Sequence, residues 1–412
     1  MAALRVATVW LLLATVVVSA CASRRLPPIG AGGQAFEPDA DETALWARAE
    51  KEEDALGKKA RFYGDPRLDE YLAQLGNRLT PVEVRASGAP PFKLEVLRDP
   101  ALNAFAMPNG RIYLHTGLLS RLETEAQLST IVSHEMIHVT HRHALGVQRD
   151  AERSSFASAA GPRAGDQLTG TAIGPTAGAI RGLGLKLAAM AAISGYGRDL
   201  ERGADQGGLE NLVRAGYDPR EAPRAFELLR SESKDRGSLE TFFLGSYAKL
   251  TERIESTRQL VRTRYAAAAA RPAVTAAEDF PLRMREVVRE NAYDDIRAGR
   301  FVVAQRQLDR VLLLTPRDPV AHVYYGDLHR LQSQRARDAA QKTRSASQAE
   351  ASYERAIELD PALPEPHRQL AFLYYQRKDR AHAREEFQKY LDLKPLASDA
   401  ARIREYLAEL DR

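Results

Sequence analysis

Apolar and polar residues recur at helical spacing over much of the N-terminal half of the chain. Between residues 42 and 59, Leu45, Ala49 and Leu56 stand among many charged residues, which predicts an exposed amphipathic helix. Residues 66–79 repeat the pattern. A longer helical run extends from Glu123 to Leu145. Further helices are expected at four later stretches, namely 183–193, 201–216, 219–232 and 239–265.

Two short stretches alternate with period two instead. Residues 92–97 and 111–115 read as half-buried strands, and Pro108-Asn109-Gly110 supplies a turn before the second strand. A small sheet beside the helical run follows from this pattern. The exposed edge of such a sheet can pair with an extended peptide, although the sequence leaves open which strand forms that edge. The fold class predicted is α+β and mostly helical.

Composition changes between the helix that ends near Leu145 and the later helices. Residues 154–180 are rich in Gly, Ala, Ser and Thr, which predicts a mobile loop or lid. Residues 183–193 are apolar but lack aromatic anchors, so a core helix is favoured over a helix lying on a membrane. An alanine-rich segment with one proline, 266–279, indicates a linker.

A repeat occupies the last third of the chain. Four positions recur with a shift of 34 residues and then of 45 residues toward the N-terminus. They are Ala383, Phe387, Leu393 and Pro395; Ala349, Tyr353, Leu359 and Pro361; and Ala304, Leu308, Leu314 and Pro316. This spacing is typical of tetratricopeptide repeats, which form an α-helical solenoid with a concave binding surface. The hydrophilic stretch 332–348 accounts for the 11 extra residues. A plain helical bundle is the alternative.

The overall composition is that of a globular protein with more than one domain. The chain has 412 residues, 28% of them charged, and a net charge of +4 in which both signs are mixed along the sequence. No basic cluster with interleaved aromatic residues occurs, so no nucleic-acid partner is expected.

The N-terminus reads as a targeting segment. Arg5 precedes thirteen apolar residues, 6–18, which are too few for a membrane span of about 20 residues. Cys21, the only cysteine of the chain, follows small residues and resembles the cleavage box of a bacterial lipoprotein. Lipidation of Cys21 would anchor the chain on a membrane, and Ala22 in place of Asp resembles outer-membrane sorting. Ordinary cleavage beside an incidental cysteine is the alternative.

The strongest chemical signal is His134-Glu135-Met136-Ile137-His138. On a helix, His134 and His138 share one face and can bind one metal ion with Glu135 beside it. With only nine histidines in the chain, such a match arises by chance in roughly one such sequence in a hundred. The alternative is a helix with two merely polar histidines.

The third ligand must come from elsewhere in the chain. His141 and Ala144 stand where the three-histidine class has Gly and His, which excludes that class. Glu201, 63 residues after His138, opens a further amphipathic run and offers a carboxylate.

Several motifs together are similar to a known family. They are Asn103-Ala-Phe-Ala-Met-Pro-Asn-Gly110, Tyr113-Leu-His-Thr-Gly-Leu-Leu119, His134-Glu-Met-Ile-His-Val-Thr-His-Arg-His143, Glu201-x-x-Ala204-Asp205 and Gly216-Tyr-Asp-Pro219. They resemble the HExxH gluzincins that include CAAX prenyl endopeptidases, Oma-type proteases and bacterial β-barrel assembly-enhancing proteases. The resemblance implies one Zn²⁺ per chain, with His134, His138 and Glu201 as ligands. It also implies Glu135 as the catalytic base and Asp205 as a carboxylate behind the ligands.

The resemblance extends to location and partners. It implies a zinc endopeptidase (EC 3.4.24) in outer-membrane protein quality control, lipid-anchored on the periplasmic face of the outer membrane. Its substrates would be misfolded or stalled outer-membrane proteins, and its repeats would bind the β-barrel assembly machinery. A chaperone or scaffold with a gated or vestigial metal site is the alternative. The domains expected are a signal peptide with lipobox (1–21), a flexible tether (22–41), a protease domain (42–265), a linker (266–279) and repeats (280–412).

Three further residues complete the set of candidates. His141 and His143 are expected behind the ligands or on the surface. Relatives carry His-Pro five residues before the Glu of a Glu-Arg-Ile sequence, where the His resembles a switch over the metal. Here Glu252-Arg-Ile254 is present, but position 247 is Tyr. Tyr247 is therefore expected as a weaker gate, or as a donor to the oxyanion, or as a loop residue without a role.

Overall fold

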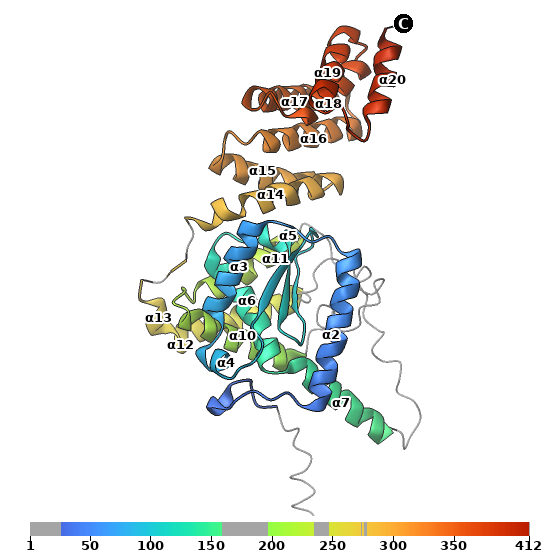
Figure 1. Ribbon diagram of the computed structural model, residues 1–412. Helices are drawn as coiled ribbons and strands as arrows, with labels where there is room; N and C mark the ends of the chain where they lie inside the picture. Colours follow the sequence, from blue (N-terminus) through green and yellow to red (C-terminus); the bar gives the residue numbers. More distant parts are fainter. Residues whose placement is uncertain (1–25, 159–196, 235–246, 273, 276–277, 412) are drawn as a thin grey trace, which may run out of the picture.

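The computed structural model describes residues 26–158, 197–234, 247–272, 274–275 and 278–411. Side chains at 153–158, 233–234 and 247–249 are not described. The architecture is mostly helical with one small sheet, followed by a stack of helix pairs (Figure 1), and this confirms the predicted fold class. Among the described helices, none combines the length and apolar character needed to cross a membrane.

The first helices lie where the spacing of apolar and polar residues predicts them. Helix α2 spans Ala40–Lys59, α3 spans Pro66–Leu79, and the short α4 spans Val82–Ala86. Asp65 begins α3, because its carboxylate accepts hydrogen bonds from the N–H groups of Arg67 and Leu68 and Pro66 fills the first helical position.

The segment that precedes α2 is packed rather than loose. A short 3-10 turn spans Ala31–Gly33, the Ile29 N–H bonds the Thr140 carbonyl at 2.8 Å, and Phe36 stacks on Trp46. The part of the expected tether that the structure describes therefore lies on the domain.

The sheet has three strands in the order β1-β3-β2. Strand β1 (Lys93–Leu97) runs parallel to β3 (Arg111–His115), and β2 (Ala104–Ala106) pairs with β3 antiparallel. Residues 61–63 cover the outer side of β1, since the Tyr63 N–H bonds Val96 and the Arg98 N–H bonds Arg61. Among the described residues, β2 is therefore the edge without a strand partner.

The helical run predicted from Glu123 to Leu145 is two helices, so the single helix was wrong. Helix α6 spans Glu125–Thr140 and α7 spans His143–Ser158; the short α5 (Thr116–Leu119) precedes them. The break falls at Arg142, whose φ is 56°. Its guanidinium pairs with the buried Glu42 of α2, which holds the left-handed turn in place. Helix α7 also takes in residues 154–158, which were expected in a loop.

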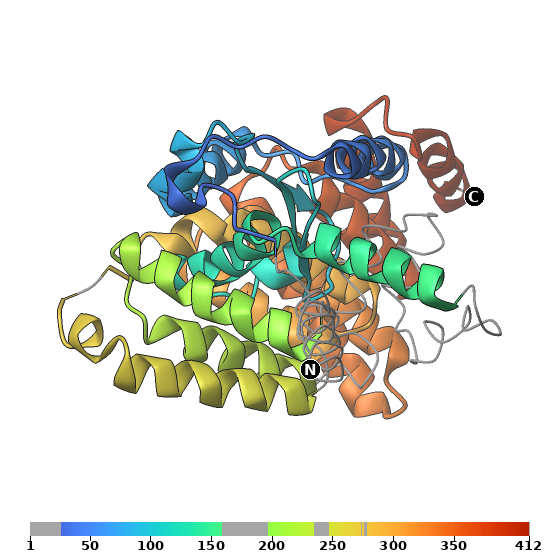
Figure 2. The same cartoon turned by 90° about the horizontal axis from the view of Figure 1, so that it is seen from below.

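Helix α6 lies between the sheet and a layer of later helices (Figure 2). This layer contains α10 (Arg198–Arg214), α11 (Glu221–Lys234) and α12 (Tyr247–Thr263). The stretch expected as a linker contains α13 (Ala266–Ala269) and then Val274, which pairs with Gly216 and Asp218 through backbone hydrogen bonds. Residues 159–182, the predicted helix at 183–193 and Cys21 lie outside the described residues.

The C-terminal third is a stack of antiparallel helix pairs that ends in a single helix (Figure 1). Ala304, Ala349 and Ala383 occupy the same position in successive pairs and are fully buried, as the repeat predicts. The 11 extra residues lengthen the middle pair to helices of 17 and 21 residues, against 13 and 14 in the next pair. The helices are α14 (Phe280–Arg297), α15 (Phe301–Leu314), α16 (Pro319–Arg335), α17 (Ala339–Leu359), α18 (Pro364–Gln376), α19 (Arg380–Leu393) and α20 (Ala400–Leu410).

The first helix pair is joined to the preceding domain through buried charges. Arg121, just after α5, bonds Asp295 of α14 at 3.1 Å and Glu232 of α11 at 3.0 Å, and Asp295 is fully buried. Arg310 of α15 donates to the carbonyls of Ser120 and Leu122. One apolar core also runs across residue 279, from Leu118 to Val288 and Leu308.

Candidate metal centre

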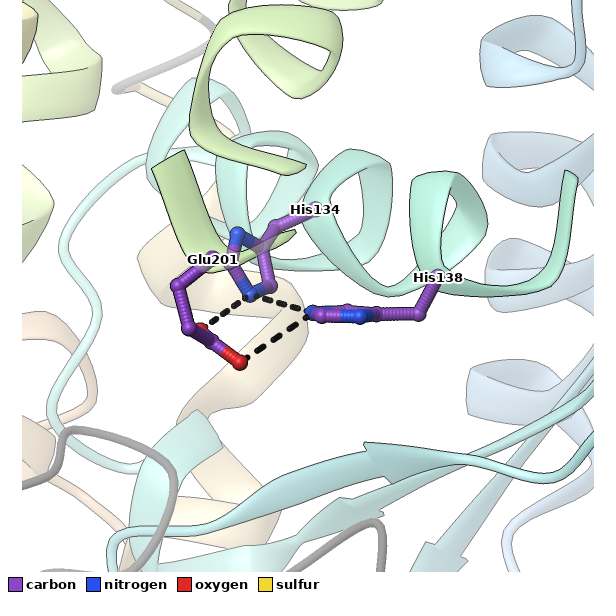
Figure 3. Close-up of side chains that lie close together, drawn as sticks. All are labelled: His134, His138 and Glu201. Atoms are coloured by element: carbon purple, nitrogen blue, oxygen red, sulfur yellow. Dashed lines mark hydrogen bonds and ion pairs between the residues drawn. The ribbon is translucent and has the colours of Figure 1, made fainter. Parts of the chain in front are cut away.

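Two histidines on α6 face one point. His134 and His138 are one helical turn apart, both are buried, and their Nε2 atoms lie 3.0 Å from each other (Figure 3). Thr124 fixes where α6 begins, because its hydroxyl accepts the N–H of Gln127 at 3.1 Å.

Glu201 reaches the same point from α10. Its Oε2 lies 3.4 Å from Nε2 of His134, and its Oε1 lies 3.7 Å from Nε2 of His138. Close packing of α10 on α6 makes this reach possible. A Cβ atom at Gly208 would lie 3.0 Å from the backbone N of His134, so a larger residue would push the helices apart.

The opposite ring nitrogens of both histidines are held. Nδ1 of His134 is 2.9 Å from Oδ1 of Asp205, and Nδ1 of His138 is 2.9 Å from Nδ1 of His143. A carboxylate can only accept, so Nδ1 of His134 carries a proton, and Nε2 is the nitrogen that can offer a lone pair to a metal ion between His138 and Glu201. The break at Arg142 brings His143 into contact with His138.

These residues fit a divalent metal ion. The three ligand atoms all lie within 4.8 Å of one another, and two imidazoles with one carboxylate are a donor set that zinc binds. Charge supports the same conclusion. Three carboxyl groups, those of Glu135, Glu201 and Asp205, surround the site with the guanidinium of Arg253, and a dication there would be attracted by their ionised forms.

Glu135 lies beside the ligands with an unusual acidity. Its side chain is buried, and burial raises the pKa of its carboxyl group to about 7, against the opposing effects of His134, Arg253 and a hydrogen bond from the Ala106 backbone. The pKa of Glu201 is lowered instead, because His134 and His138 outweigh its burial. Burial and the neighbouring His134 lower the pKa of His138, which keeps that ring neutral.

Arg253 completes the cluster and was not singled out as a site residue from the sequence. It is buried on α12 and bonds Asp205 at 2.7 Å. The Glu252-Arg-Ile254 sequence could have pointed to Arg253. Its ion pair with Asp205, 48 residues away, cannot be predicted from one sequence. The Ala106 backbone contact was missed for the same reason.

The other predicted site residues lie apart from this cluster or outside the description. His141 ends α6, is partly exposed, and lies 3.3 Å from the Thr140 hydroxyl through Nδ1. Tyr247 is the first residue of α12, but its side chain is not described. Cys21 lies outside the described residues.

Comparison with known proteins adds the family. Residues 66–261 match the model of peptidase family M48. The chain carries an M48 peptidase domain. This confirms the resemblance inferred from the motifs, and such a domain implies a metal cofactor.

Curated relatives share this M48 domain. The chain is 35% identical over 173 residues to a putative β-barrel assembly-enhancing protease of Vibrio cholerae, covering 41% of this chain and 34% of the relative. It is 30% identical over 191 residues to the β-barrel assembly-enhancing protease of Escherichia coli, covering 43% and 36%. A mitochondrial metalloendopeptidase OMA1 of Arabidopsis thaliana is 32% identical, covering 34% of this chain and 26% of the relative. The matches thus span about a third of the first two relatives.

Among solved structures, a thermophilic TPR protein of Thermus thermophilus aligns with this chain. The alignment covers 37% of this chain and 78% of the TPR protein. The identity is 21% and the TM-score is 0.28, which is too low to establish a shared fold. The description of the repeats therefore rests on the helix pairs of this chain.

Proposed function

We propose that this protein is a zinc-dependent endopeptidase of the bacterial cell envelope. The observation that carries the proposal is the convergence of His134, His138 and Glu201 on one point, with the buried Glu135 beside them. The M48 match and the protease names of the relatives support it.

Glu135 is the proposed general base. A zinc ion held by the three ligands would supply a Lewis acid for the scissile carbonyl and the attacking water. Glu135 would accept a proton from that water and pass it to the leaving amine, and a pKa near neutrality suits both steps. Asp205 would hold His134 in the required tautomer, and His143 would support His138.

The free edge of β2 is the proposed site for the peptide backbone. Met107 bonds Arg111 across the hairpin, whereas the Ala106 N–H turns away from β3 toward Glu135. An extended segment added along β2 would therefore pass beside the base, held by main-chain hydrogen bonds that read little sequence. Unfolded protein segments are the substrate class that fits this edge.

The proposed location is the periplasmic face of the outer membrane. The names of the bacterial relatives refer to β-barrel assembly, which supports misfolded or stalled outer-membrane proteins as substrates and the assembly machinery as a partner of the repeats. Lipidation of Cys21 is the proposed anchor. Cys21→Ser should release the protein from membrane fractions, and unchanged fractionation without lipid on the mature N-terminus would contradict the anchor.

The decisive experiment compares full-length protein with Glu135→Gln. Casein cleavage with added zinc should be lost in the variant by at least about a hundredfold, because the proton acceptor is gone. About one zinc per chain should remain in both proteins, as Glu135 is not a ligand. Equal cleavage by both would exclude Glu135 as the base. Absence of cleavage by either, with clients still bound, would favour the chaperone alternative.

A further inference from the structure

Arg253 makes several polar contacts beside the metal centre, most of them with Asp205. Its Nε lies 3.0 Å from Oδ2 of Asp205, and one terminal nitrogen lies 2.7 Å from Oδ1. Both carboxylate oxygens are thus held by one planar group, an arrangement that an arginine fork provides and a lysine does not.

The same terminal nitrogen lies 3.2 Å from Nδ1 of His134. A guanidinium has no lone pair to accept with, and Nδ1 of His134 already carries a proton for Asp205. The two donors therefore meet at Oδ1 of Asp205 from different sides. This pins the oxygen between the ring and the guanidinium.

Packing keeps the guanidinium in this position. It lies over the ring of Phe226 of α11 at 4.2 Å from the centroid, and the whole residue is only 7% exposed. With the ring on one face and Asp205 at its edge, the fork has little room to rotate.

We propose that Arg253 is a positioning residue of the metal centre. It acts through Asp205, fixing the carboxylate that sets the tautomer and the orientation of His134. The inference rests on the proposed zinc site and adds a residue on α12 to it. A guanidinium has no lone pair with which to bind a metal ion, so Arg253 is not itself a ligand.

The charge of Arg253 and its positioning of Asp205 have opposite expected effects on zinc affinity. A substitution of Arg253 can therefore distinguish the two roles. Arg253→Met removes a positive charge from beside the site, which by electrostatics alone would strengthen binding of a dication. Loss of the fork would free Asp205 and loosen His134, which weakens binding. In a folded Arg253→Met protein, a weaker affinity therefore points to lost positioning and not to the lost charge. Arg253→Lys keeps the charge but lacks the fork, so it should also bind zinc more weakly.

The test measures zinc affinity of the full-length protein by competition with a chelator. We expect Arg253→Met and Arg253→Lys to weaken zinc binding by at least about tenfold, and to shift the visible absorption of the cobalt-substituted protein. Arg258→Met is the matched control, because Arg258 is on the same helix but is partly exposed and paired with Glu227 away from the metal centre. It should bind both metals as the wild type does.

A double-mutant cycle tests the route through Asp205. In an Asp205→Asn background, Arg253→Met should weaken zinc binding by less than about threefold further, since its partner carboxylate is gone. The inference would be overturned if the double variant lost as much zinc affinity as the product of the two single losses. Wild-type affinity in both Arg253 variants would also overturn it. If Arg253→Met does not fold, Arg253→Lys decides the matter alone. Tight zinc binding by a wild type that cleaves nothing would instead overturn the peptidase proposal and leave this inference standing.

Discussion

The acidity of Glu135 is set by its burial together with several neighbouring groups. Burial raises its pKa, while His134, Arg253 and the Ala106 N–H favour the ionised form, and burial prevails at a value of about 7. The sequence predicts the residue and its role, because the HExxH spacing is local. The acidity depends on α12 and β2, which are distant along the chain.

We predict a pH dependence from this balance. Glu135 must be ionised to accept a proton, so the rate of hydrolysis should fall as the pH falls through the pKa of Glu135. A bound dication favours the carboxylate, which places the midpoint at or below about 7. The rate of casein cleavage between pH 5 and 9, at saturating zinc, measures it. A rate that stays constant down to pH 5 would contradict the assignment.

Tyr247 gives a second prediction at this scale. Neutral phenol is a poor metal ligand with a pKa near 10, so we expect a gate that is weak or a hydroxyl that aids the oxyanion. Tyr247→Phe should raise the cleavage rate in the first case and lower it in the second, whereas Tyr247→His should give a slower enzyme. Wild-type rates in both variants would leave Tyr247 without a role at the metal.

At the scale of elements, the junction of α6 with α10 carries the site. Glycines at 207 and 208 let the two helices approach, and Gly203, on the same helix, meets nothing within 4 Å. The distance from Glu201 to the two histidines therefore depends on a contact in which two glycines of α10 lie against α6.

Gly208→Ala should separate α10 from α6 and weaken both folding and metal binding. Its Cβ would lie 3.0 Å from the His134 backbone, and overpacking of this kind costs about 1–3 kcal/mol. Gly203→Ala is the control and should stabilise the protein by about 0.5–1 kcal/mol through helix propensity. Denaturant unfolding and zinc affinity are the measurements. Equal affinity in Gly208→Ala and wild type would show that the contact does not position Glu201.

The elements that the sequence predicts well are those with their own local signals. Helix α3 and strand β3 have the predicted bounds, since Asp65-Pro66 and the turn before Arg111 mark where each begins. Strand β2 was not predicted, because its three residues are all buried and show no alternation. The break at Arg142 was not predicted either. No Gly or Pro marks it, and Glu42, about 100 residues away in the chain, holds it.

For the whole molecule, the junction at Arg121 makes the first helix pair part of the peptidase fold. Removing that pair would leave Arg121, which is 4% exposed, without Asp295 and would uncover the core around Leu118. Arg121 would keep its ion pair with Glu232, so the main loss is the apolar core that the two parts share. The sequence suggests a linker before residue 280 and so an independent domain, because the contacts that join the two parts are all distant in the chain.

Truncation should reveal this dependence. A chain that ends at Asp279 should lose thermal stability and zinc binding, whereas one that ends at Arg317 retains α14 and α15 and should keep both. Both truncated proteins should lose partners that bind α16–α20. Thermal unfolding and zinc content check the prediction. A chain ending at Asp279 that melts with the full-length protein would show that the two parts fold independently.

The junction at Arg121 also fixes the distance between the later repeats and the metal centre. If a client protein binds the later repeats, its bound region stays at a set separation from Glu135, because the contacts of Arg121 and Arg310 hold the first helix pair on the peptidase domain. Only a client with a slack segment long enough to bridge that separation could enter the edge of β2. A client whose chain is already taken up in a folded barrel has no slack to offer. The fixed separation would thus select bound clients by the length of chain that is still unfolded.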